Sequence, residues 1–178
     1  RDFLKAVSDG KEFTSIFISS VLNSVPFEKD RQHIACICAA LCRPFTKLYA
    51  CASSTSETGY RQVNGKAFHN ESNAGNIAFR LEYESGVRIG DFQDKPKVQK
   101  YHTKKEFFDL FSPFFRKVEI SEMTGNVNAQ CENVRRIPWE RIEEALRFEF
   151  DLPYPDGSRM GLVEEAIAAF KRRYEIFG

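Results

Sequence analysis

The sequence lacks both a strong charge imbalance and a long hydrophobic segment. Its 26 Lys and Arg side chains nearly balance 25 Asp and Glu, which leaves a formal net charge of +1. No global field therefore favours a polyphosphate partner, although a local basic patch is still compatible with this balance. No apolar run approaches the length needed to span a bilayer, and no secretory signal is evident at the start. With 42% hydrophobic and 29% charged residues over 178 positions, the composition is typical of one folded domain, or of one domain with an appendage.

The five cysteines lack the spacing of a zinc site or of a disulfide framework. Cys38 and Cys42 are separated by three residues, and no second Cys or His pair completes the four ligands that zinc requires. Together with Cys36 they fall in an apolar, helix-like segment, where a free cysteine packs as a small hydrophobe. We therefore expect core cysteines, no metal site, and a reducing, cytoplasmic environment.

The pattern of the first fifty residues predicts a strand–helix–strand unit. Residues 13–20 and 46–52 are short runs rich in β-branched and aromatic residues, which is typical of strands buried on both faces. Between them, apolar residues recur at helical spacing over 30–42, and Arg43-Pro44 ends that helix. Such a unit implies parallel strands joined by a right-handed crossover.

The rest of the chain shows capping, turn and amphipathic signals. Thr103 and Glu106 have the spacing of a capping box, in which each side chain bonds the other residue's backbone amide at the start of a helix. The other expected elements are a helix ending by residue 12, a loop at 53–76, a hairpin at 78–84 and 86–92, an extended piece at 98–102, a hairpin at 117–123 and 127–131 that turns at 124–126, and helices at 138–150 and 161–174.

Three segments, in the right order, give the chain a resemblance to a known family. Phe13–Pro26 resembles the fourth strand of class I S-adenosylmethionine-dependent methyltransferases and the loop that leaves it. Arg43-Pro44-Phe45-Thr46 is similar to the turn before the family's fifth strand, and 99–110 resembles the start of its fifth helix. The resemblance covers roughly residues 10–133, and the family's fold ends in an antiparallel hairpin. Thr14 stands where the family often has Asp, and the glycine-rich cofactor turn is absent.

The resemblance implies the C-terminal half of a Rossmann-like α/β methyltransferase sheet, parallel strands followed by an antiparallel hairpin, with extra C-terminal helices. The partial domain would span 1–136, with an inserted hairpin at about 78–102, and a helical extension would span 137–178. The implied activity is transfer of a methyl group from S-adenosylmethionine to an unidentified acceptor. The fragment alone would be inactive, so we expect a missing N-terminal half or a partner chain to complete the sheet, with a homodimer as another arrangement.

The resemblance also implies site residues near the end of the predicted first strand. The backbone at Ser19 and Ser20 would face the methionine part of the cofactor, and Leu22 would lie near the adenine. Asn23 lies where a substrate would be bound, since ligands of open α/β sheets sit beyond the carboxyl ends of the strands. Serine and asparagine also serve simply to bond loop amides, which is the alternative interpretation.

Tyr101 and His102 are the candidates for substrate binding and catalysis. A histidine there offers a general base, because its ordinary pKa lies near neutrality, although no acid partner is visible in the sequence. The alternative is that the pair merely precedes a helix, with Tyr101 packed and His102 solvated. The lysines near 95–105 form a basic stretch that would steer an anion or be ordinary solvated surface.

Two other functions remain open from the sequence. The missing glycine-rich turn favours a methyltransferase-like, non-catalytic binding or regulatory subunit. The basic stretch and the C-terminal helices are compatible with a nucleic-acid-binding protein, although the balanced charge disfavours it. The sequence has no P-loop, HExxH or GxSxG motif, no Asp-Pro-Pro-Tyr tetrad for amino methylation of bases and no Pro-Cys nucleophile for cytosine chemistry.

Overall fold

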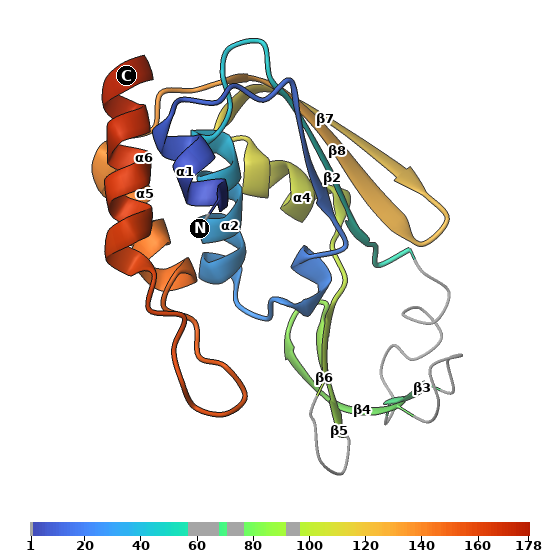
Figure 1. The fold of residues 1–178 in the computed structure, drawn as a ribbon. Helices are drawn as coiled ribbons and strands as arrows, with labels where there is room; N and C mark the ends of the chain where they lie inside the picture. The colour runs from blue at the N-terminus through green and yellow to red at the C-terminus, as the bar shows by residue number, and fades with distance from the viewer. Residues whose placement is uncertain (1, 57–67, 71–76, 92–96) are drawn as a thin grey trace.

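In the computed structural model a four-stranded sheet stands against a block of helices (Figure 1). The structure describes residues 2–56, 68–70, 77–91 and 97–178. The strands of this main sheet follow the order β1-β2-β8-β7. Their bounds are β1 Ser15–Ser19, β2 Lys47–Ser53, β7 Phe115–Met123 and β8 Asn126–Val134.

The predicted strand–helix–strand unit is confirmed. β1 and β2 are parallel neighbours, with Ile16 opposite Leu48 and Ser19 opposite Cys51. They are joined by the short 3-10 helix η1 (Leu22–Ser24) and by α2 (Glu28–Ala40). The expected hairpin follows, with β8 antiparallel to β2 and β7 antiparallel to β8. Gly125, whose φ is +77°, supplies the left-handed residue in its turn.

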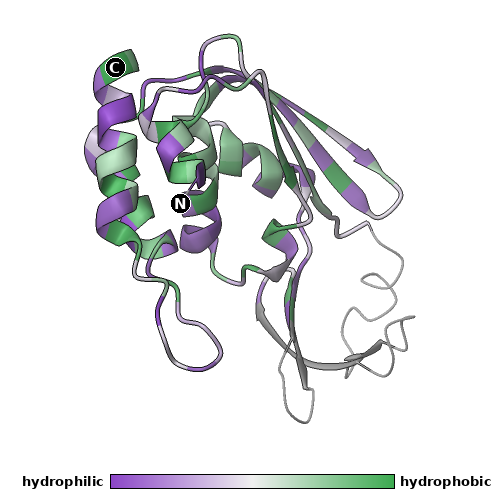
Figure 2. Cartoon of the chain, viewed as in Figure 1, coloured by the Kyte–Doolittle hydropathy of each residue, from purple (hydrophilic) through white to green (hydrophobic). Residues whose placement is uncertain are grey.

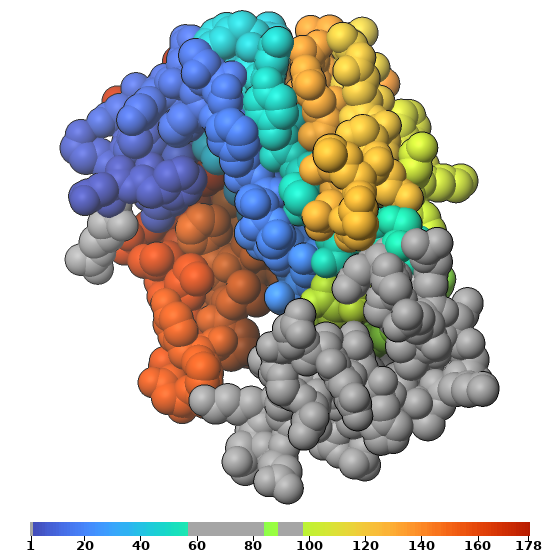
Figure 3. All heavy atoms as spheres, turned by 90° about the vertical axis from the view of Figure 1, so that its right-hand side faces the viewer, coloured from blue at the N-terminus to red at the C-terminus, as the bar shows by residue number. Residues whose placement is uncertain are grey.

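The expectation that both parallel strands are buried on both faces is wrong. In β2 the side chains alternate, so that Leu48, Ala50 and Ala52 are buried while Tyr49 on the other face is partly exposed. In β1 only Ile18 is buried, and Phe17 is 72% exposed. The helices cover one face of the sheet, and no described helix covers the other (Figures 1 and 3). In Figure 3 the four strands lie side by side in blue, cyan, orange and yellow.

The covered side holds helices from both ends of the chain. They are α1 (Asp2–Ser8), α2, α4 (Lys104–Phe111), α5 (Trp139–Glu149) and α6 (Val163–Phe177). α5 packs on α2 and α6 packs on α1, so the C-terminal helices lie beyond the other helices rather than on the open face of the sheet. Hydrophobic residues gather where helices face one another and the sheet (Figure 2), and Leu146 and Phe170 belong to the same buried cluster as Leu48. No described helix is both long and apolar enough to cross a membrane.

The start of α4 has the predicted capping box. The Thr103 hydroxyl accepts from the Glu106 amide at 3.1 Å, and the Glu106 carboxylate accepts from the Thr103 amide at 2.8 Å. The helix buries Phe107, Leu110 and Phe111 against the core. Local sequence therefore fixes where this helix begins, and its apolar face fixes how it packs.

A second four-stranded sheet is inserted between β2 and α4, and all its strands are antiparallel. The strands are β3 (Phe68–Asn70), β4 (Ile77–Glu84), β5 (Val87–Asp91) and β6 (Lys97–Lys100). The predicted hairpin at 78–92 is confirmed as far as Asp91, and the first part of the extended piece at 98–102 belongs to β6, the fourth strand of this sheet. β3 corrects the predicted loop at 53–76, of which 57–67 and 71–76 lie outside the described residues.

Candidate functional site

The carboxyl ends of β1 and β2 lie together, where the resemblance places a cofactor. Ser19 is the exposed last residue of β1. The Ser20 amide donates to the Cys51 carbonyl at 2.9 Å, and the φ of Ser20 is +59°. Few residues other than glycine adopt this left-handed conformation, and they concentrate where function constrains the backbone. The strand therefore ends in a sharp turn with exposed serines.

The next predicted residues have structural tasks. Leu22 is fully buried in the core, so its side chain is committed to packing rather than to an exposed adenine pocket. The Asn23 side-chain oxygen accepts from the Ser53 amide at 2.7 Å. This bond links the loop after β1 to the end of β2, which is the loop-amide role considered for Asn23 from the sequence.

Tyr101 and His102 reach the same strand end from the inserted sheet. The His102 amide donates to the Ser53 carbonyl at 2.8 Å, and the Thr55 amide donates to the His102 carbonyl at 3.1 Å. Tyr101 is buried, and the Arg88 guanidinium lies 5.6 Å from the centre of its ring. The structure thus gathers Ser19, Asn23 and His102 at one edge of the main sheet.

The buried ring of His102 contradicts the expectation of a solvated side chain or a base with a pKa near neutrality. The residue is only 2% exposed, and neither ring nitrogen has a hydrogen-bond partner in the part of the chain that the structure describes. The ring meets Phe107 edge-on, with 5.2 Å between the ring centroids. Burial, reinforced by the positive charges of Lys100 and Arg31, lowers the pKa of His102 to about 3. At neutral pH the imidazole is uncharged and only weakly basic.

His102 borders a cavity of about 270 Å³ between α2, α4 and the turn joining β4 to β5. Most of its lining is charged or polar, and its residues are Glu28, Arg31, Glu84, Ser85, Lys100, His102, Glu106, Asp109 and Leu110. Of these the sequence singled out His102, and Lys100 as one lysine of the basic stretch. The rest come from segments far apart in the chain, and the capping box was the one signal that pointed to Glu106.

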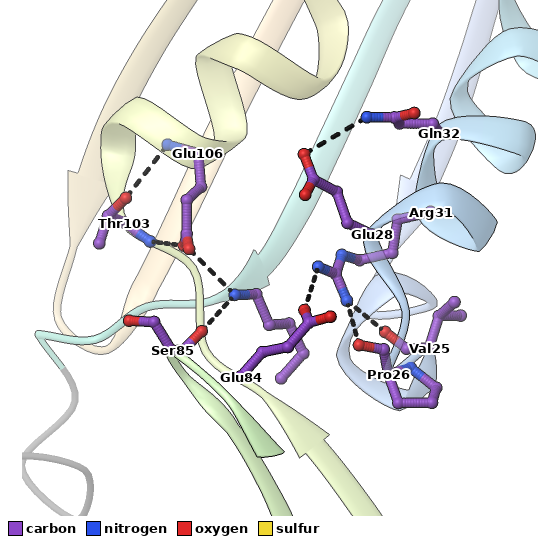
Figure 4. A network of polar contacts seen from close by, with 10 residues as sticks. Val25, Pro26, Glu28, Arg31, Gln32, Glu84, Ser85, Thr103 and Glu106 are labelled. Carbon is purple, nitrogen blue, oxygen red and sulfur yellow. Dashed lines mark hydrogen bonds and ion pairs between the residues drawn. The ribbon is translucent and has the colours of Figure 1, made fainter. Parts of the chain in front are cut away.

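Arg31 of α2 is held beside this cavity by backbone oxygens (Figure 4). One guanidinium nitrogen donates to the carbonyls of Val25 and Pro26, both at 2.8 Å. Another nitrogen lies 3.8 Å from the Glu84 carboxylate. Burial lowers the pKa of Arg31, while Glu84 opposes that shift. A buried charge of this kind is stable only because carbonyls and a carboxylate satisfy it.

Lys100 of β6 makes the second buried charge. The side chain is 2% exposed, and its ammonium donates to the Ser85 carbonyl at 2.8 Å and to Glu106 at 3.2 Å (Figure 4). Burial lowers the pKa of Lys100, and Glu106 opposes the shift. Glu106 therefore both caps α4 and neutralises a lysine delivered by the inserted sheet.

The predicted basic stretch at 95–105 does not form a uniform solvated surface. Lys100 is buried, and Lys105 pairs with Asp109 at 2.5 Å. Lys95 lies outside the described residues. At least two of the lysines in this stretch are therefore used for contacts within the protein. This weakens the case that the stretch steers an anion or binds nucleic acid.

The cysteines in α2 and just after its end pack in or against the core, as predicted. Cys36 and Cys42 are buried, and burial raises the pKa of Cys36 to about 11 and that of Cys42 to about 12. Such thiols stay protonated at neutral pH. Within the described residues no group of three or more His, Cys, Asp or Glu side chains is arranged to hold a metal ion.

Comparison with solved structures finds similar proteins at low sequence identity. A SAM-dependent methyltransferase from Methanosarcina mazei is 17% identical, over 72% of this chain and 65% of that one, with a TM-score of 0.48. DhpI in a complex with SAH is 11% identical, over 73% and 53%, with a TM-score of 0.43. A S-adenosylmethionine-dependent methyltransferase from Clostridium acetobutylicum is 7% identical, over 71% and 61%, with a TM-score of 0.45.

In each case this chain spans less than two thirds of the similar protein. No protein-family model and no curated protein matches the sequence.

Proposed function

We propose that the protein transfers a methyl group from S-adenosylmethionine to an acceptor, and that this chain contributes one half of the catalytic domain. The observation that carries the proposal is the direction and order of the strands. β1 and β2 are parallel and joined through α2, and the sheet ends in the antiparallel pair β8 and β7. This is the arrangement expected for the second half of a class I methyltransferase sheet.

The outer edge of β1 supports a missing half. No strand of the described chain pairs with that edge, because β1 pairs only with β2. In open α/β sheets the ligand lies beyond the carboxyl ends of the strands, where the strand order reverses. If a further strand pairs with this edge of β1, the crevice lies between the carboxyl end of the added strand and the Ser19–Ser20 turn.

The residues of this chain fit one wall of such a crevice. Ser19 and Ser20 are exposed and would contact the methionine part of S-adenosylmethionine, which supplies the methyl group when bound. Asn23 and His102 hold the ends of β1, β2 and the inserted sheet together through Ser53. With the pKa of His102 near 3, proton removal by this imidazole contributes little, and catalysis rests on orienting the acceptor.

The stacked aromatic pair on the open face supports the same proposal. The rings of Phe17 and Tyr49 are 5.2 Å apart and nearly parallel, and they lie on the face that no described helix covers. A large exposed aromatic is typical of an interaction surface when it belongs to a larger apolar patch. We propose that the missing half, from an N-terminal segment or a partner chain, covers this pair. A homodimer through this face is the alternative arrangement.

The proposal is tested by calorimetric titration of the full native protein with S-adenosylmethionine. We expect saturable binding that Ser20→Val weakens at least about tenfold, because a β-branched residue is strained at positive φ. Ser15→Val, at the exposed opposite end of β1, is the matched control and should leave the affinity unchanged. A folded full-length protein that does not bind S-adenosylmethionine would overturn the proposal and favour a non-catalytic binding or regulatory subunit.

A further inference from the structure

A second cavity lies at the opposite end of the main sheet. It has a volume of about 220 Å³ and is enclosed by the end of α2, the turn before β2, the segment joining β8 to α5, and the end of α6. Its lining combines arginines with apolar side chains, and the residues are Ala39, Ala40, Cys42, Arg43, Pro44, Val134, Arg135, Arg136, Ile137, Ile142, Phe170, Arg173, Tyr174, Phe177 and Gly178.

The charged side chains that line this cavity are all arginines. Among the described residues no Asp or Glu belongs to the lining, and the carboxylate paired with Arg43 is that of Glu12, 3.8 Å from the arginine Nε. This Nε is buried and makes no hydrogen bond with any residue that the structure describes. Four like charges around one small space repel one another, so the cavity has a local positive potential that the balanced net charge of the chain conceals.

Two of the arginines keep most of their donors unused. The Arg135 Nε donates to the carbonyls of Ser112 and Phe115, each at 3.3 Å, and its other two nitrogens have no partner within the described residues. Arg136 is exposed and forms no ion pair or hydrogen bond with any described residue. Free guanidinium donors that line one cavity can bind an oxyanion with charge-assisted hydrogen bonds.

Arg173 is committed to the protein itself. It is buried and donates to the Lys11 carbonyl at 2.6 Å and to the Leu41 carbonyl at 2.9 Å. The Phe177 ring lies 3.9 Å from the Arg43 guanidinium and 5.0 Å from that of Arg173. These contacts hold one wall of the cavity rigid, and neutral carbonyls do not cancel the charge of Arg173.

The floor of the cavity is apolar. Ile137, Ile142 and Phe170 are buried members of the main hydrophobic cluster. A concave site with apolar walls and a few convergent charged donors is the usual form of a small-molecule site. Sites for drug-sized ligands usually have volumes of about 300 Å³ or more. This cavity is smaller, so its size suits a ligand with a single ring.

We propose that this cavity binds a small molecule that carries a phosphate or carboxylate group on a flat apolar body. The oxyanion is bound by Arg135 and Arg136, and the apolar body lies on the floor beside Tyr174. The small volume and the apolar floor favour a small ligand over a nucleic acid, which would need an extended basic surface.

This inference does not rest on the proposed methyl transfer. Arg43 and Pro44 precede the first residue of β2, and Cys131 of β8 lies opposite Leu48 near that same end. The Ser19–Ser20 turn is at the other end of the parallel pair. A ligand in the arginine cavity therefore does not compete with one at the carboxyl ends of the strands.

The test is calorimetric titration of the full native protein with phenyl phosphate, benzoate, inorganic phosphate and phenol. We expect saturable binding of phenyl phosphate, of benzoate or of both, weaker binding of inorganic phosphate, and no binding of uncharged phenol. Comparing phenyl phosphate with benzoate distinguishes the two head groups. Affinity should fall as NaCl is raised, because salt screens exposed guanidinium groups.

The variant R135Q/R136Q should weaken binding at least about tenfold, because it removes the charge-assisted donors. The matched control is K171Q/R172Q, which removes the same charge from exposed positions of α6 outside the cavity and should change the affinity less than about twofold. Circular dichroism checks that both variants fold.

Failure of both phenyl phosphate and benzoate to bind would overturn the proposal, as would equal affinities of the native protein and R135Q/R136Q. Tighter binding of a short oligonucleotide, lost in R135Q/R136Q, would replace the small molecule with a nucleic acid. Neither result bears on S-adenosylmethionine binding, which Ser20→Val tests separately.

Discussion

The two faces of the main sheet differ although the same strands build both. On the helix side, Leu48 and Ala50 of β2 and Val127 and Cys131 of β8 are buried in one hydrophobic cluster. On the other side no helix of the described chain covers the strands (Figure 3). Adjacent residues of one strand thus have opposite surroundings, and the folding energy of this region comes from one side.

The open face is itself divided. Over β7 and β8 it is polar, and Lys117 pairs with Glu119 and Glu132 at 3.4 and 3.1 Å. Over β1 and β2 it carries the stacked Phe17 and Tyr49. The open face is therefore not uniformly apolar. The polar β7–β8 half is suited to contact with water, and the aromatic pair marks the part of the face that the proposed missing half would cover.

The largest effect is expected on the covered face. Leu48→Ala should lower the free energy of unfolding by about 2–5 kcal/mol, because it leaves a cavity under the helices. Lys47→Ala, one residue earlier on the open face, should cost less than about 1 kcal/mol, since its ion pair with Glu132 is exposed. Urea unfolding measures both, and equal losses would remove the contrast between the two faces.

Because His102 is buried, we expect the free energy of unfolding to depend on pH. Its pKa is about 3 when folded and near 6.5 when unfolded, so the unfolded chain takes up the proton first. Stability should therefore fall as pH drops below about 6.5, by up to about 1.4 kcal/mol per pH unit. Glu149 acts oppositely, because burial raises its pKa to about 7 and protonation then favours the folded state.

Comparing native protein with His102→Gln separates these contributions, since Glu149 is present in both. Urea unfolding between pH 5 and 7.5 should show a smaller acid loss in the variant. In Glu149→Gln the loss should be steeper than in the native protein. If His102→Gln left the pH dependence unchanged, the imidazole would not be buried in neutral form.

The smallest effect is expected at the edge of the open face. Phe17→Ser in the 178-residue chain should change the free energy of unfolding by less than about 0.5 kcal/mol, because the ring is mostly in water. In a longer native protein that covers this face, the same substitution should cost more, since it removes buried aromatic area. Thermal unfolding of both forms makes the comparison, and a large loss in the short chain would contradict an open face.

Local signals predicted the elements whose cause is local. The spacing of Thr103 and Glu106 identified the capping box, and Gly125 identified the turn between β7 and β8. The parallel pair followed from two short apolar runs around a helix. The prediction that β1 and β2 are buried on both faces was wrong. Phe17 and Tyr49 are large aromatic residues typical of a core, but no described helix covers them.

The site was predicted only in part, because its chemistry depends on distant segments. Ser19, Asn23 and His102 all lie near the carboxyl ends of β1 and β2. The burial of Lys100 could not be read from its neighbours, since Ser85 and Glu106 that satisfy it arrive from a turn and a helix cap. In the sequence, the only sign of the arginine cavity was the Arg135-Arg136 dipeptide. Such a pair is typical of ordinary solvated surface.

The buried Lys100 means that the inserted sheet is not a removable module. Replacing the insertion with a short linker would delete Lys100, Ser85 and Glu84 together, leaving the carboxylate of Glu106 without its cation and Arg31 without its anion. Gly86 reinforces this dependence, since a Cβ there would lie 2.2 Å from the Tyr101 carbonyl oxygen. Grafts or deletions in this region therefore have to exchange the charges on both sides of the junction at once.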